Sequence, residues 1–223
     1  MNRARVFCIA VALIVSSQVG SAQDLSRYRA YVLGSSLDSV LGASALRAAD
    51  AKTLHERPAK IQELEWRARL SSRDELADPV RGAVFSFCDD ALYQVVVSYD
   101  LDRTDGLSNS DIIAALTVSY GAPVLRSVHN RPLDAPPDTV VLAQWDRAAS
   151  SLTLLRGVYS AEFQLILTAK ALSTRARSAI REAGRLDAIE APRRELEQRK
   201  KDAAVAAAER DKIRAANRTA FRP

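Results

Sequence analysis

Both histidines of this 223-residue chain lie in the same tetrapeptide, H-x-R-P. One copy begins at His55 and the other at His129. Imidazole nitrogens are common zinc ligands, and a guanidinium binds a carboxylate or phosphate through two parallel hydrogen bonds. If the two loops converge in space, His55 and His129 could bind a metal, or Arg57 and Arg131 could clamp an anion.

A structural interpretation of these loops competes with the chemical one. In it, the proline fixes the entry into the following strand, while the histidine and arginine pack beside it. Two histidines without local Cys or carboxylate ligands are a weak indication of zinc, and Glu56 has no acidic counterpart in the second copy. We therefore expect no metal, cofactor or catalytic residue, and retain the His and Arg of each copy as binding candidates: His55, Arg57, His129 and Arg131.

Two other segments contain residues that could do chemistry. Cys88 would be the only thiol left after removal of a signal peptide, and the carboxylates of Asp89 and Asp90 beside it would raise its pKa. We expect it to be a small, semi-buried residue at a strand end. Residues 100–106 resemble a calcium loop, but with Gly106 at the sixth position non-acidic residues occupy ligand positions, which favours an acidic turn.

Four features occur twice in the same order: a serine that begins a helix, H-x-R-P, a strand with a tryptophan, and a hairpin. The serines are Ser35 and Ser108, each followed three residues later by an aspartate that completes a capping box. The tryptophans, the only two in the chain, are Trp66 and Trp145. We interpret this as a tandem duplication, with repeats at about 34–100 and 107–168. The first strand is expected at 28–33, before the first repeat.

Each repeat is predicted to fold as one helix and three strands. A three-stranded sheet with a single helix cannot bury its apolar face alone, so the two halves should share a core. The predicted fold is α+β: tandem helix-plus-three-strand units forming an antiparallel sheet, followed by a C-terminal helical extension. Both tryptophans are expected in the core.

The start and end of these helices resemble a known family. Residues 34–40 read G-S-S-L-D-S-V and residues 121–123 read G-A-P. This pattern is similar to small outer-membrane-assembly lipoprotein domains of the SmpA/OmlA type. The tandem arrangement resembles the β-lactamase inhibitor proteins, and that resemblance implies binding through the concave face of a double sheet.

The N-terminus has the pattern of a cleavable signal peptide. Arg3 and Arg5 form a positive region, residues 6–15 form a short uncharged apolar run, and residues 20–22 are small. The apolar run is too short to span a bilayer. We predict a signal peptide at residues 1–22, a body at 23–167 and a tail at 168–223, with the mature protein periplasmic or secreted and without a transmembrane segment.

Charge is distributed unevenly between the body and the tail. Residues 23–167 hold 15 basic and 19 acidic side chains, whereas residues 168–223 hold 15 basic and 8 acidic ones. The tail is predicted to be helical, with a narrow apolar stripe that Pro192 interrupts. A basic tail on a mildly acidic body is typical of proteins with an anionic partner. The tail lacks interleaved aromatic residues, so we expect no nucleic-acid partner.

Three functions are compatible with these patterns. The sequence favours a non-enzymatic envelope or secreted module that binds a macromolecular partner, most simply a protein, through its sheet. A hydrolase or metal-dependent enzyme built around the two H-x-R-P loops is the alternative. In the third, the tail alone binds an anionic polymer by electrostatic attraction.

The signal-peptide interpretation predicts that the mature protein begins at Gln23, because the small residues that signal peptidase requires end at Ala22. N-terminal sequencing of protein recovered from an expressing bacterium checks this. Material that retains Met1 would contradict the export hypothesis.

Overall fold

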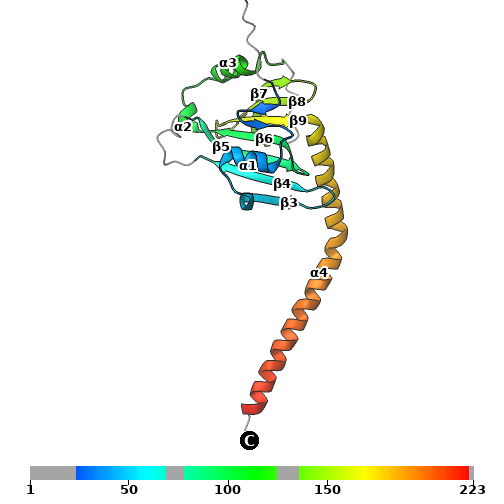
Figure 1. Ribbon diagram of the computed structural model, residues 1–223. Helices are drawn as coiled ribbons and strands as arrows, with labels where there is room; N and C mark the ends of the chain where they lie inside the picture. The colour runs from blue at the N-terminus through cyan, green and yellow to red at the C-terminus, as the bar shows by residue number, and fades with distance from the viewer. Residues whose placement is uncertain (1–23, 69–77, 125–135, 221–223) are drawn as a thin grey trace, which may run out of the picture.

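The computed structural model describes residues 24–68, 78–124 and 136–220, and the following elements lie within them (Figure 1). The strands are β1 (Arg27–Tyr28), β2 (Tyr31–Val32), β3 (Ala51–His55), β4 (Ile61–Arg67), β5 (Val80–Cys88), β6 (Ala91–Tyr99), β7 (Thr139–Asp146), β8 (Ser150–Gly157) and β9 (Phe163–Ala169). The helices are α1 (Leu37–Ser44), the short 3-10 helix η1 (Ala48–Asp50), α2 (Leu101–Thr104), α3 (Asn109–Tyr120) and α4 (Lys170–Ala220).

Seven of the strands form one antiparallel sheet in the order β3-β4-β5-β6-β9-β8-β7. In the first unit α1 precedes the meander β4-β5-β6, and in the second α3 precedes the meander β7-β8-β9. The two meanders join where β6 pairs with β9, and β3 adds a strand to the outer edge of the first. The predicted fold class, with two helix-plus-three-strand units in one antiparallel sheet and a C-terminal helix, is confirmed.

The core lies between this sheet and the helices α1 and α3. Alternate side chains of a strand share a face, so paired residues form rows across the sheet. One fully buried row contains Leu64, Phe85, Val95, Leu167, Leu152 and Trp145. The neighbouring row on the same face contains Trp66, Ala83, Val97, Leu165, Leu154 and Ala143. Apolar side chains of α1 and α3 pack against both rows.

The strand register relates the two units by a half-turn about an axis between β6 and β9. One row of paired residues runs from Glu65 on β4 to Gln144 on β7 and crosses the central pair at Val96. The residues that follow the two ends are Trp66 and Trp145. The tryptophans therefore occupy equivalent positions on corresponding strands.

The two tryptophans differ in burial, and the expectation that both are core residues is wrong for Trp66. Trp145 is 0% exposed, and its indole N–H donates to the carbonyl of Gly121 at 2.6 Å. Trp66 is only partly buried at the rim of the core. The helices explain the difference, since α1 has 8 residues and α3 has 12, so α1 covers less of its sheet.

The predicted capping box of α3 is confirmed. The Ser108 hydroxyl accepts from the amide of Asp111 at 3.3 Å, and the Asp111 carboxylate accepts from the amide of Ser108 at 2.8 Å. The helix ends at Gly121, whose φ of 82° lies in the region that favours glycine.

The cap of α1 differs from the prediction by one residue. Ser36, not Ser35, caps the helix by accepting from the amide of Ser39, while the Ser35 hydroxyl donates to a backbone carbonyl. The Leu37 amide donates to Asp90 at 2.9 Å. Asp90 lies 53 residues from Leu37 in the sequence, so local sequence alone could not indicate this contact.

Residues 28–33, expected as one strand, instead form part of the β1–β2 hairpin. The chain turns at Arg29, which adopts a left-handed φ of 54°. The hairpin packs onto the core, where the rings of Tyr31 and Phe85 lie 4.5 Å apart between centroids.

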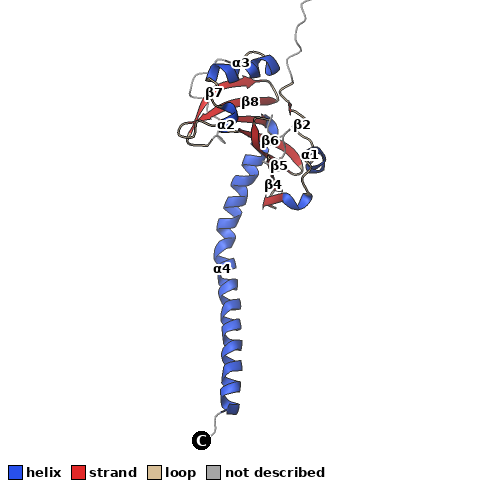
Figure 2. Ribbon diagram, turned by 90° about the vertical axis from the view of Figure 1, so that its left-hand side faces the viewer, coloured by secondary structure: helices blue, strands red, loops and turns tan. Residues whose placement is uncertain are grey.

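Helix α4 crosses one end of the sheet and then leaves the body as a straight arm (Figures 1 and 2). Ala176, Ala179 and Ala183 are buried, whereas every residue from 193 to 220 is exposed. The expected interruption at Pro192 is wrong, because the helix continues through it to Ala220. Among the described residues no helix is both long and apolar enough to cross a membrane.

The difference in burial predicts unequal costs of removing the two indoles. Trp145→Ala should lower the free energy of unfolding by about 3–5 kcal/mol, since it empties a fully buried aromatic site. Trp66→Ala should cost about 1–2 kcal/mol, since part of that side chain already contacts solvent. Chemical denaturation of both variants measures this, and equal losses would contradict the assignment of Trp66 to the rim.

Candidate functional site

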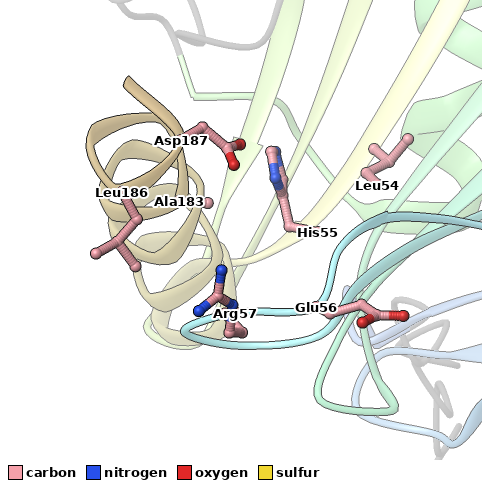
Figure 3. Close-up of a pocket in the computed structure, with 7 residues that line it drawn as sticks. All are labelled: Leu54, His55, Glu56, Arg57, Ala183, Leu186 and Asp187. Atoms are coloured by element: carbon pink, nitrogen blue, oxygen red, sulfur yellow. The ribbon is translucent and has the colours of Figure 1, made fainter. Parts of the chain in front are cut away.

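The first H-x-R-P loop connects β3 to β4 and lies against α4 (Figure 3). The Arg57 guanidinium donates to both carboxylate oxygens of Glu190, at 3.0 and 3.3 Å. His55 and Asp187 point toward one another, whereas Glu56 points away from the helix. Two of the four predicted binding residues, His55 and Arg57, thus contact or face α4.

A notch of about 210 Å³ separates the loop from the helix and is lined by Leu54, His55, Glu56, Arg57, Ala183, Leu186 and Asp187. A hydrogen bond from Arg194 lowers the pKa of the Asp187 carboxyl, and interactions with His55 and Arg57 add smaller effects in the same direction. The two charged side chains that the notch presents beside α4, Arg57 and Asp187, thus already have partners in Glu190 and Arg194.

These ion pairs lie on both sides of Pro192. Arg194 donates to Asp187 at 2.7 Å and lies 3.6 Å from Glu190, so it links the turn after the proline to the turns before it. Arg57 holds Glu190 from the loop. Exposed ion pairs contribute little to stability. Their effect here is positional, because they fix the loop, the docked part of α4 and the start of its exposed part relative to one another.

His129 and Arg131 lie outside the described residues, so the convergence on which a shared metal or anion site would depend is not tested. The described strands give partial information. β4 begins at Ile61, paired with Cys88, at the end of the sheet where α4 lies. β7 begins at the other end, where Thr139 pairs with Gly157. The three ranges that the structure describes contain no group of three or more His, Cys, Asp or Glu side chains positioned to hold a metal ion.

The thiol of Cys88 is 1% exposed beneath α4, packed with Ile61, Tyr93 and Ala176. Burial raises its pKa, and the adjacent Asp89 raises it further. A thiol with a raised pKa is a poor nucleophile. Cys88 is a small residue at a strand end, as expected, but it is fully buried rather than semi-buried.

The β5–β6 turn beside Cys88 contacts elements on both faces of the sheet. Asp89 and Asp90 form this two-residue loop with φ values of 47° and 64°. Asp90 accepts from α1, as described above. Asp89 accepts from the Lys60 amide at 2.9 Å and forms an ion pair with Arg175 of α4.

A cluster that sequence reasoning missed lies where β1, β6 and α3 meet. Tyr28 and Tyr120 are buried there, and Arg29 binds Asp78 through two hydrogen bonds of 2.5 and 2.8 Å. Burial raises the pKa of Tyr120 to about 12 and that of Tyr99 higher still. The Arg29–Asp78 pair and the buried tyrosines tie the β1–β2 hairpin to β6 and α3. No short motif marked it, because its members are far apart in the sequence.

The second surface that could bind a partner is the sheet face opposite α1 and α3, here called the polar face. Alternation places on it a row of Glu63, Ser86, Gln94, Thr168 and Ser151, and a row of Glu65, Val84, Val96, Ile166, Thr153 and Gln144. Ser86, Gln94, Thr153 and Ile166 are buried, Glu65 is exposed, and the other members of the two rows are partly exposed. Helix α4 packs on the same face, over Ile61 and Cys88 at one end of the strands.

The polar face has a depression of about 330 Å³ over β4, β5 and β6. Gly82, Val84, Val96 and Ser98 are among its lining residues. Charges at its rim are paired, Arg67 with Glu65 at 2.7 Å and Arg81 with Glu162 at 2.6 Å. The hollow thus has small side chains at its floor and long, mostly charged side chains, Glu65, Arg67 and Arg81, at its rim.

No protein-family model matches this chain, and neither the curated proteins nor the solved structures contain a match.

The buried thiol provides a test of helix docking. Native protein at pH 8 should react with a thiol reagent far more slowly than unfolded protein, because α4 covers Cys88 and its pKa is raised. Ala176→Asp should increase labelling by introducing a charge into this contact, whereas Ala206→Asp on the exposed part of α4 should not. Equal labelling of the two variants would mean that α4 does not shield Cys88.

Proposed function

We propose that the mature chain is an exported, non-catalytic module that binds a protein of the cell envelope through the polar face of its sheet, with α4 as an accessory contact. The difference between the two sheet faces carries this proposal. One face is an apolar surface covered by α1 and α3, and the other has two rows of mixed polar and apolar side chains and a depression whose rim charges are paired.

The contacts of the first H-x-R-P loop support a binding module over an enzyme. Arg57 is held by Glu190, so its guanidinium positions α4, and His55 faces the same helix at Asp187. In this proposal the loop positions α4 beside the polar face.

We also attribute the two units to an ancestral duplication. The register places Trp66 and Trp145 equivalently, and the sequence similarity extends upstream of each histidine. Residues 51–58 read A-K-T-L-H-E-R-P and residues 125–132 read L-R-S-V-H-N-R-P. A symmetric pair of meanders supports binding through the sheet, since it makes one broad face from two small units.

Export of the module rests on the sequence of residues 1–22, with its basic start, apolar run and small residues before Gln23. A module released by signal peptidase would meet partners in the periplasm or outside the cell.

Photo-crosslinking tests the assignment of the binding face. A photoreactive amino acid at Val84 or Val96, which are partly exposed on the polar face, should yield a discrete adduct when the full mature chain is irradiated in its native envelope. The matched control is Val118 on α3, which is 87% exposed. Mass spectrometry identifies the adduct. Adducts from Val118 alone, or from none of the positions, would contradict the proposal.

A further inference from the structure

Residues 193–220 of α4, here called the arm, carry 9 basic and 5 acidic side chains. All are exposed, and the described body makes no hydrogen bond to the arm beyond the first turn after Pro192. An α-helix rises 1.5 Å per residue, so the arm extends about 42 Å. No apolar packing stabilises it, so its surface charges determine what it can bind.

Most of its acidic side chains have partners within the helix. Glu195 pairs with Arg199 at 3.9 Å, and Glu209 pairs with Lys212 at 3.8 Å. Arg193 pairs with Glu197 at 3.1 Å. Among the described residues, five basic side chains of the arm form no ion pair: Lys200, Lys201, Arg210, Arg214 and Arg218.

Three of these unpaired cations lie along one side of the helix. At about 100° per residue, Lys200, Arg214 and Arg218 fall within about 40° of one line and span about 27 Å. Ala203 and Ala207 lie between them on the same side. These three cations are here called the basic row. Two acidic residues lie near this line: Asp211 at about 20°, which leaves the row with a net positive charge, and Glu197 at about 60°, which pairs with Arg193.

Like charges four residues apart, such as Arg214 and Arg218, destabilise a helix slightly. The helix dipole stabilises cations only in the last turn of a helix. It can therefore offset the repulsion near Arg218, but it does not stabilise a cation as far from the end as Lys200. Short alanines between separated cations leave room for a chain that lies along the helix. A polymer with regularly spaced anions would place one negative group near each cation.

We propose that the basic row binds an anionic polysaccharide along the helix. A membrane surface fits less well, because Val205 lies about 180° and Ile213 about 100° around the helix from Leu196, so the arm has no apolar side to insert. The arm has no aromatic side chain on which nucleic-acid bases could stack. This inference deepens the accessory role of α4, while the sheet binding proposed above does not depend on it.

Binding of the full mature chain to immobilised polygalacturonate, a carboxylated polysaccharide, tests the proposal. Neutral dextran is the background control. Raising NaCl from about 50 to 200 mM should weaken binding at least about tenfold, because several cations release counterions on contact. The triple variant Lys200→Gln, Arg214→Gln, Arg218→Gln should weaken it by a similar factor at low salt.

The matched control is the triple variant Arg199→Gln, Lys201→Gln, Lys212→Gln. It removes the same net charge from cations that lie at least about 100° around the helix from Lys200, and it should retain binding within about twofold. Circular dichroism verifies that both variants remain helical, as expected for glutamine. Equal losses in the two variants, no binding, or binding only to phosphatidylglycerol vesicles would each overturn the proposal. If photo-crosslinking from Val84 and Val96 gave no adduct, these polysaccharide-binding results would be unchanged. The two proposals can therefore fail separately.

Discussion

The pairing of β6 with β9 is the contact on which the remaining structure depends. Each unit is a three-stranded meander with one helix, too small to bury an apolar face by itself. Joining the two central strands aligns Val95 with Leu167 and Val97 with Leu165, and so extends both apolar rows from β4 to β7. The same pairing determines where β9 ends. Since α4 begins directly after β9, the helix must start at the end of the sheet where the first H-x-R-P loop lies.

Local sequence signals predicted much of this fold. Ser108 with Asp111, Gly121, and the alternation of Phe163, Leu165 and Leu167 act over a few residues, so they can be identified in the sequence. Features set by distant contacts could not be predicted. Two of these features, the cap at Ser36 and the partial burial of Trp66, depend on elements far away in the sequence. The third is the continuation of α4 through Pro192 into its exposed part.

The candidate site shows the same division. The sequence singled out His55 and Arg57 because the tetrapeptide recurs, but it could not reveal that their partners lie on α4, 133 residues away in the case of Arg57 and Glu190. The polar face could not be identified from the sequence, since residues such as Gly82 and Ser98 belong to no motif. Which side chains share an uncovered face depends on the order of the strands and on the face that the helices cover, and both are set by the tertiary structure.

The β5–β6 turn and the arm together have a mechanical consequence. Asp90 caps α1 on one side of the sheet and Asp89 pairs with Arg175 of α4 on the other, so two adjacent residues hold both helices.

The arm is a lever about 42 Å long whose pivot is the loop contact at Glu190. A sideways load at its distal end is therefore multiplied into torque on a few exposed ion pairs, and those pairs yield before the buried rows of the sheet are strained.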